Sequence, residues 1–269
     1  MIGVINYGAG NLGSVMNALA RLGLPARFVE GPEELMVRRR PGGTAAGSSI
    51  GLGGGSSVGL GSGTSVGFVS PVGQTGQVGQ TGQTGQTGQT GQAGQTGPGF
   101  SAVIFPGDGH FATAMQVLEH TGYDQAIREW IAADLPFLGI CIGLQLLFET
   151  SEEAPPEDGR EIRGLSVIPG TVKKFVGPKV PQIGWNETRG SPRSRLFRSL
   201  PDRSFFYYIH SYYVVPAEAD WTAAEADYYG TYCSAVERGA LTAVQFHPEK
   251  SGTLGLELLR RWTEVYHVG

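Results

Sequence analysis

The chain has 269 residues, with 24 acidic and 20 basic side chains and a formal net charge of −4 at pH 7. This balance argues against a nucleic-acid partner and against a membrane-surface partner, because both select clustered positive charge. The two cysteines, the lack of a secretory signal and the lack of a long apolar run predict a reducing, cytoplasmic setting.

The first elements alternate between strand and helix. Residues 2–5 form a short apolar run, and residues 12–19 place apolar side chains at helical spacing before a stop at Gly23. Residues 26–29 then predict a second strand, and residues 32–35 predict a short helix start. This order is typical of strands that pair in parallel.

Residues 41–99 differ in composition from the rest of the chain. They contain no charged residue and 21 of the 43 glycines, and residues 73–97 place glycine at every third position. Such a stretch cannot bury enough apolar surface to offset the entropy lost on ordering. We therefore predict a single domain over residues 1–269, interrupted by a disordered Gly/Gln/Ser/Thr-rich insertion at about 41–99.

The alternation resumes after the insertion. Residues 102–105 predict a buried strand, and residues 112–133 predict one or two amphipathic helices. Residues 136–140 predict another strand, which turns at Cys141 into a helix through Phe148. The pattern favours a parallel sheet covered on both faces.

The sequence changes character after Ser151. Strand-like, aromatic-rich segments follow between turns, at 162–176, 180–186, 205–215, 223–236 and 241–246. A helix is expected at about 253–266. The predicted fold is α/β, an open and mostly parallel sheet with flanking helices and an added antiparallel portion.

Cys141 stands between two glycines, in a G-x-C-x-G turn that follows an apolar strand. Such an elbow holds a nucleophile in a cramped backbone conformation, and the helix that begins there directs N–H groups at the sulfur. A buried, inert cysteine is the alternative, because cysteine is among the most buried residues. Cys233 lies in a strand-like run without flanking glycines or a nearby base and is predicted to be such a packing residue.

His247 and Glu249 supply the remaining parts of a catalytic triad. In an extended segment, residues two apart project to the same side, so Glu249 can accept the proton of one imidazole nitrogen. The other nitrogen is then free to take the thiol proton. For the tetrahedral oxyanion we expect two backbone N–H donors, those of Ile142 and Asp108, with the Asp108 carboxylate pointing away.

Together these residues carry a resemblance to the triad (class I) glutamine amidotransferases, and more specifically to the glutaminase subunits of imidazole glycerol phosphate synthases. The supporting segments run from the first residues to the C-terminus: Asn6-Tyr7-Gly8-Ala9-Gly10-Asn11-Leu12, Pro106-Gly107-x-Gly109, Gly139-Ile140-Cys141-Ile142-Gly143, Pro181-Gln182-x-Gly184-Trp185-Asn186, His210-Ser211-Tyr212 and His247-Pro248-Glu249-Lys250-Ser251. The triad is shared by many amidotransferases, whereas the other segments favour the specific subfamily.

The resemblance implies that Cys141 attacks the glutamine side-chain amide and that His247 shuttles the proton, without a metal ion or a cofactor. It also implies a glutamine-binding set, which is Gly107, Gly143, Gln145, Glu153 and Ser211. Without the resemblance, Gln145 is equally a helix-surface residue and Glu153 an acidic loop residue. The family normally has an apolar residue where this chain has Asp108, which is a departure at the oxyanion site.

The resemblance further implies a heterodimer in which ammonia passes to a (β/α)8-barrel cyclase subunit. The interface residues expected from it are Asn11, Trp185, Asn186, Lys250 and Ser251, although an aromatic core residue and solvated polar ends are an alternative interpretation. Two other functions remain open at this point. They are the glutaminase subunit of another amidotransferase, and a regulatory relative that keeps the fold without catalysis.

Overall fold

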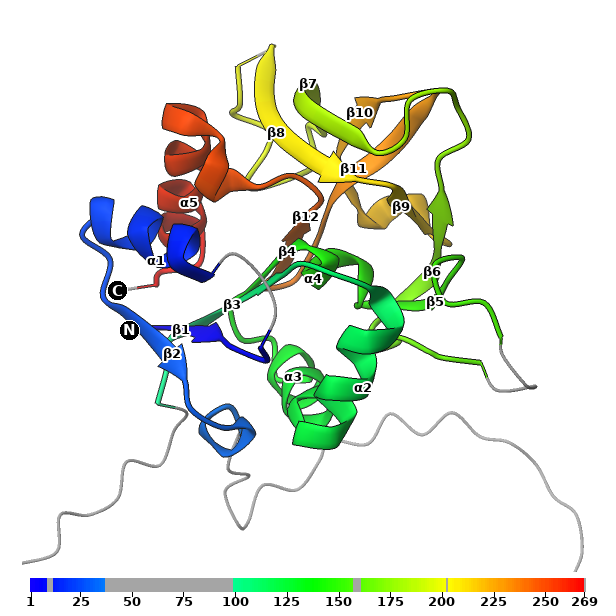
Figure 1. The fold of residues 1–269 in the computed structure, drawn as a ribbon. Coiled ribbons are helices and arrows are strands. Elements are labelled where there is room, and N and C mark those ends of the chain that lie inside the picture. Colours follow the sequence, from blue (N-terminus) through cyan, green and yellow to red (C-terminus); the bar gives the residue numbers. More distant parts are fainter. Residues whose placement is uncertain (9–11, 37–98, 157–160, 202, 269) are drawn as a thin grey trace, which may run out of the picture. The chain divides into compact units, whose positions relative to one another are not determined.

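The computed structural model describes residues 1–8, 12–36, 99–156, 161–201 and 203–268 (Figure 1). All of them belong to the same unit of the chain. The predicted insertion at about 41–99 falls, apart from its last residue, outside the described residues, and its disorder stays a prediction. Asn11 lies outside them as well.

Within the described residues, twelve strands form one sheet. The strands are β1 (Ile2–Ile5), β2 (Ala26–Val29), β3 (Ala102–Gly107), β4 (Phe137–Cys141), β5 (Phe148–Ser151), β6 (Ile168–Lys174), β7 (Gln182–Gly190), β8 (Ser204–His210), β9 (Tyr212–Pro216), β10 (Thr222–Asp227), β11 (Thr231–Arg238) and β12 (Leu241–Val244). The main order is β2-β1-β3-β4-β12-β11-β10-β7-β8. Pairing is parallel from β2 to β12 and antiparallel from β12 to β8, which confirms the predicted α/β fold with an antiparallel addition.

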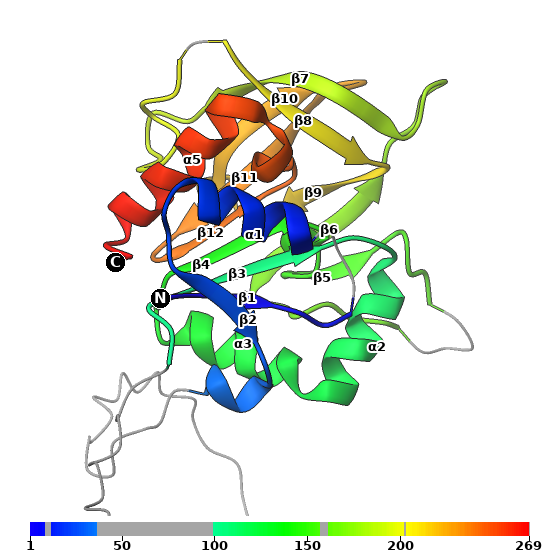
Figure 2. The same cartoon turned by 60° about the vertical axis from the view of Figure 1, so that its left-hand side comes forward.

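Two pairs of helices cover the parallel strands. Helices α1 (Leu12–Arg21) and α5 (Gly252–Val265) lie on one face, and α2 (Phe111–Thr121) and α3 (Tyr123–Ala132) lie on the other (Figures 1 and 2). The break between α2 and α3 falls at Gly122, whose φ of 78° lies in the left-handed region that glycine tolerates. The sequence therefore predicted these helices correctly as elements, with boundaries within a few residues.

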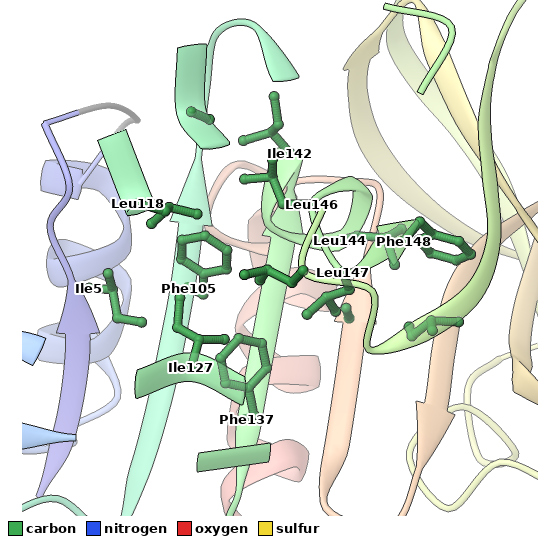
Figure 3. Close-up of a cluster of buried hydrophobic side chains, with 14 of the residues drawn as sticks. Ile5, Phe105, Leu118, Ile127, Phe137, Ile142, Leu144, Leu146, Leu147 and Phe148 are labelled. Carbon is green, nitrogen blue, oxygen red and sulfur yellow. The ribbon is translucent and has the colours of Figure 1, made fainter. Parts of the chain in front are cut away.

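The layer beneath α2 and α3 is a continuous apolar core. Ile5, Phe105 and Phe137, from three adjacent strands, pack with Leu118 of α2 and Ile127 of α3, and all five are fully buried (Figure 3). Burying a side chain of this size contributes roughly 1.5–3 kcal/mol. This core fixes β3 and β4, whose carboxyl ends carry the candidate site.

The helix predicted from Cys141 through Phe148 is much shorter in the structure. Helix α4 covers only Ile142–Gln145, and β5 begins at Phe148. The Leu147 N–H donates to the Leu144 carbonyl, three residues back, so the α-helical pattern ends there, and residues 164–168 donate backbone hydrogen bonds to the carbonyls of residues 146–149. Figure 3 shows the side chains of this segment directed into the core rather than along one helical face.

The antiparallel portion departs from the prediction in three places. Strand β6 begins at Ile168, six residues later than expected. The segment 205–215 is divided at Ser211 into β8 and β9, and the segment 223–236 is divided at 228–230 into β10 and β11. Strand β8 pairs with β7, whereas β9 pairs with β6 and β11. Of the described helices, none has the length and apolarity needed to cross a bilayer.

Candidate active site

The nucleophile candidate lies at a strained turn between β4 and α4. Cys141 has φ 57° and ψ −111°, and its side chain is largely buried. The flanking glycines permit this turn, because a Cβ on Gly143 would lie 2.1 Å from the carbonyl oxygen of Phe105. The sharp turn predicted from G-x-C-x-G is therefore present, and a positive φ at a non-glycine residue is a strain found mainly at functional sites.

The short length of α4 changes one part of the electrostatic argument. With only four residues, α4 has a small macrodipole, so the expected helix-dipole effect on the sulfur is weak. What remains is the individual backbone N–H of Ile142, next to the nucleophile. Its role as an oxyanion donor stays a prediction.

His247 and Glu249 follow β12 and form a buried pair. Glu249 Oε1 lies 2.8 Å from His247 Nδ1, and the two side chains are 2% and 5% exposed. Because a carboxylate only accepts hydrogen bonds, Nδ1 carries the proton and Nε2 is the nitrogen available for proton transfer. This is the orienting contact that the spacing of the two residues predicts.

The electrostatic link between His247 and Cys141 is strong. Burial acts to lower the pKa of His247, but the negative charges of Cys141 and Glu249 outweigh it and raise the pKa to about 10. Nε2 has no hydrogen-bond partner within the described residues, so we attribute the effect of Cys141 to the charge of its thiolate. The arrangement favours a protonated imidazole beside the Cys141 sulfur.

Strand β3 delivers the predicted oxyanion loop to the nucleophile. Gly107 is the register partner of Cys141. A Cβ on Gly107 would lie 2.1 Å from the Ile142 side chain and 2.5 Å from the Tyr7 hydroxyl, so only glycine fits there. The Asp108 side chain is exposed, and its Oδ1 accepts the Gly109 N–H at 2.9 Å. The predicted donor role of the Asp108 backbone N–H stays open.

Tyr7 is a site residue that the sequence did not reveal. Its side chain is 6% exposed, and its hydroxyl has no hydrogen-bond partner among the described residues. Burial, followed by the charges of Cys141 and Asp108, raises the pKa of Tyr7 well above its usual range. The hydroxyl therefore stays protonated beside the nucleophile. From sequence alone, Asn6-Tyr7-Gly8 is a family motif without a role for Tyr7, because nothing local indicates that the end of β1 approaches β4.

A cavity of about 220 Å³ opens above these residues. Its lining includes most of the predicted set, namely Cys141, Ile142, Asp108, Gln145, Glu153 and Ser211. His247, Glu249, Gly107 and Gly143 are not among the lining residues. The two glycines leave room for close contacts around the nucleophile. The volume is below the ~300–1,000 Å³ of drug-sized pockets, which suits a ligand of amino-acid size.

A larger hollow of about 580 Å³ lies away from this site, over β10 and β11. Its arginines are paired with acidic side chains, as in Arg193 with Asp220 and Arg195 with Glu237. It has neither a nucleophile nor an unpaired charge within the described residues, and we assign it no role.

The sequence matches the family described as glutamine amidotransferase class-I over residues 99–264, which include all three triad candidates. The chain belongs to this family. The imidazole glycerol phosphate synthase subunit HisH of Moorella thermoacetica is 37% identical over 270 residues, covering 100% of this chain and 97% of that protein. The HisH subunit of Desulfitobacterium hafniense strain Y51 is 34% identical over 97% of this chain and 93% of its own length. The chain is thus a HisH-type class I glutamine amidotransferase.

Two further comparisons concern a solved structure and a longer relative. A crystal structure of a glutamine amidotransferase aligns with a TM-score of 0.59 at 17% identity, over 99% of both chains, which supports the fold alone. The chloroplastic imidazole glycerol phosphate synthase hisHF of Arabidopsis thaliana is 46% identical over 165 residues, covering 60% of this chain and 27% of that protein.

In this HisH-type chain, the side chains of Glu153 and Gln145 are already hydrogen bonded to other residues of the chain. Glu153 Oε2 accepts the backbone N–H of Phe111, at the start of α2, at 2.8 Å. Gln145 Nε2 donates to the Tyr212 carbonyl and to Gln245 Oε1, each at 3.1 Å. Both side chains line the cavity, and their contact with a substrate stays a prediction.

The predicted interface residues fall in different environments. Trp185 on β7 is 57% exposed, and Lys250 is partly exposed. Asn186 Nδ2 donates to the Asp227 carbonyl at 3.0 Å. Ser251, by contrast, is 2% exposed, so its side chain lies beneath the surface rather than on it. Its hydroxyl donates to the His247 carbonyl at 2.6 Å and accepts the Tyr207 N–H at 2.9 Å.

Replacing Ser251 by alanine is expected to lower the free energy of unfolding by about 2 kcal/mol, because the Tyr207 N–H loses its partner and the His247 carbonyl keeps only the Lys250 N–H. Chemical denaturation of the purified chain measures this change. Ser191→Ala is the matched control, since its hydroxyl accepts only a long 3.4 Å bond from Arg193, and we expect a change within about 0.5 kcal/mol. Equal effects of the two substitutions would contradict the structural role given to Ser251.

Proposed function

We propose that this chain hydrolyses glutamine to glutamate and ammonia through Cys141, His247 and Glu249. The ammonia passes to a cyclase subunit that makes imidazole glycerol phosphate and aminoimidazole carboxamide ribotide in histidine biosynthesis. The observation that carries the proposal is the buried Cys-His-Glu arrangement in a chain that matches HisH subunits over its whole length.

The proposed reaction has two halves. The Cys141 thiolate attacks the carboxamide carbon, and a backbone N–H such as that of Ile142 stabilises the oxyanion. As the C–N bond breaks, His247 gives its proton to the leaving nitrogen, which departs as ammonia and leaves a thioester. Neutral His247 then takes a proton from water, and the resulting hydroxide attacks the thioester. The C–S bond breaks, glutamate is released and the thiolate is regenerated. Glu249 holds the imidazole orientation throughout.

An exposed apolar face supports the docking of a partner beside the cavity. The hairpin of β7 and β8 presents four large side chains that are 39–57% exposed, Ile183, Trp185, Phe205 and Ile209. Ile183 is opposite Ile209 in register, so the side chains form a contiguous row. Exposed apolar patches of this kind mark interaction surfaces. Ile209 also lines the cavity, so a partner on this face would meet the ammonia at its source.

Replacing Trp185 by alanine is expected to weaken binding of the cyclase subunit by about 30-fold or more, the effect of losing one interfacial aromatic hot spot. Titration calorimetry with the purified cyclase subunit measures this change. Phe28→Ala is the matched control, since Phe28 is 39% exposed but lies on β2, at the other end of the sheet order. Unchanged affinity for Trp185→Ala would remove Trp185 from the interface.

The function itself is tested by glutamate release from glutamine. The purified chain is assayed alone and then with the cyclase subunit and its ribulosyl substrate. Release that the partner stimulates supports the proposal. A folded complex that makes imidazole glycerol phosphate from added ammonia but not from glutamine would identify the chain as a non-catalytic relative.

A further inference from the structure

Gln245 is a buried amide that neither the triad nor the predicted substrate set includes. It follows directly on β12, where Val244 is the register partner of Ile140, so Gln245 lies level with Cys141 on the adjacent strand. Its backbone N–H donates to the Ser234 carbonyl at 2.8 Å, and the residue is 0% exposed. A polar side chain in such a place is expected to have specific partners.

The Gln245 amide contacts the nucleophile with its nitrogen. Nε2 lies 3.8 Å from Cys141 Sγ, within range of a hydrogen bond to sulfur. The other neighbour of Sγ is the Ile209 carbonyl oxygen, 3.9 Å away, which can only accept a proton from a thiol. The Ile209 carbonyl therefore favours the thiol, whereas the Gln245 N–H favours the thiolate.

The oxygen of the same amide orients Gln145. Gln145 Nε2 has two N–H groups, and they are directed at two acceptors, Gln245 Oε1 and the Tyr212 carbonyl. The Tyr212 carbonyl also lies 2.7 Å from His210 Nδ1. Burial lowers the pKa of His210 to about 4, so His210 is neutral and Nδ1–H is the donor in that contact.

With both N–H groups engaged, Gln145 has only its Oε1 left for a ligand. Gln145 lines the cavity, so the group it offers there is an acceptor. An acceptor at this point matches an N–H group of the substrate, either the ammonium or the carboxamide of an amino acid. An amide turned the other way would leave Gln145 oxygen facing the Gln245 oxygen and the Tyr212 carbonyl, which is repulsive.

We propose that Gln245 is a positioning residue for glutamine hydrolysis, whose N–H stabilises the Cys141 thiolate and whose oxygen fixes Gln145 as an acceptor for a substrate N–H group. This inference rests on the proposed function, because it concerns the same site. It assigns one side chain to two tasks, activation of the nucleophile and recognition of the substrate. The two tasks are separable by experiment.

The test compares Gln245→Met with Gln145→Met, two apolar replacements of similar shape. The first readout is the rate of Cys141 alkylation by iodoacetamide at pH 7, located by peptide mass mapping so that Cys233 is scored separately. The second readout is kcat and KM for glutamine in the complex with the cyclase subunit. Thermal unfolding of each variant establishes that it is folded.

We expect Gln245→Met to slow Cys141 alkylation about tenfold, to lower kcat and to raise KM. Gln145→Met is expected to raise KM several-fold and to leave alkylation of the free chain unchanged, because the Gln245 N–H stays on the sulfur. An alkylation rate of folded Gln245→Met equal to that of the unaltered chain would overturn the role in thiolate stabilisation.

Gln145→Glu tests the orientation of the Gln145 amide and does not depend on whether Gln245→Met folds. A carboxylate is the same size and is a stronger acceptor for an ammonium group, but it has no N–H for Gln245 or Tyr212. We therefore expect its KM for glutamine to rise at least as much as that of Gln145→Met. A lower KM than that of the unaltered chain would overturn the inference. Alkylation needs neither glutamine nor partner, so a failure of the proposed function would still leave the first readout decisive.

Discussion

Replacing Cys141 by alanine is expected to lower the rate of glutamine-dependent synthesis about 10,000-fold or more, while ammonia-dependent synthesis by the same complex continues. The reason is that only the thiolate at the β4–α4 turn can form the thioester, whereas added ammonia enters after that step. The measurement is product formation by the complex with the cyclase subunit, first with glutamine and then with an ammonium salt.

Cys233→Ala is the matched control for this experiment. Cys233 is also buried, but its Sγ lies 3.3 Å from the Ala235 carbonyl, and burial raises the pKa of its thiol to about 12. The thiol is therefore inert, and glutamine-dependent synthesis should persist in the variant. Residual glutamine-dependent activity in Cys141→Ala within tenfold of the unaltered chain would exclude Cys141 as the nucleophile.

The elements predicted well are those with a local signature. Strand 26–29 and the C-terminal helix match their observed bounds closely, because apolar periodicity and stop residues are local properties. The turn at Cys141 was predictable for the same reason, since glycines on both sides of it mark a tight approach of backbone. His247 and Glu249 were predictable because two residues of an extended segment share a side.

The remaining features of the site depend on contacts between distant segments. The segment that follows α4 is hydrogen bonded to residues 164–168, and no signal within 141–148 indicates that pairing. Gln245 stands beside a noted motif, but its meaning comes from the pairing of β12 with β4. Ser251 is polar and ends a motif, which favours a surface position from sequence alone, and its burial depends on contact with Tyr207, 44 residues away in the sequence.

The site is thus assembled from three neighbouring strand ends with different tasks. Strand β3 brings Gly107 against the nucleophile, β4 supplies Cys141, and β12 leads into Gln245 and His247. Sites of open α/β sheets form at such carboxyl ends. The antiparallel addition closes the cavity from the other side with residues of β8, and β8 also contributes to the exposed apolar row. The cavity and the exposed apolar row therefore share a strand.

Replacing Glu249 by glutamine is expected to lower kcat for glutamine hydrolysis by about 100-fold to 10,000-fold, with little change in KM. In the unaltered chain the carboxylate fixes the proton on His247 Nδ1 at 2.8 Å. A glutamine amide can donate to Nδ1 instead, which places the proton of neutral His247 on Nε2 and removes the base that takes a proton from water. Steady-state kinetics of the complex with the cyclase subunit measure the loss.

The pH dependence of the same variant gives a second, directional result. In the unaltered chain, burial opposes protonation of His247, but the charges of Cys141 and Glu249 raise its pKa to about 10, so the imidazolium proposed to protonate the leaving nitrogen is lost only as pH rises through that value. Removing the Glu249 charge removes one of the causes that raise the pKa. The alkaline limb of the rate profile must therefore move to lower pH.

Glu257→Gln is the matched control, because Glu257 is an ion-paired carboxylate on the exposed side of α5. Its kcat and alkaline limb should equal those of the unaltered chain. If Glu249→Gln instead kept its kcat and its alkaline limb, the carboxylate would serve only to fill a buried site. The orientation of the imidazole would then be set by the His247 backbone alone. That backbone is held by the bond from the His247 N–H to the Tyr207 carbonyl and by the bond from the Ser251 hydroxyl to the His247 carbonyl.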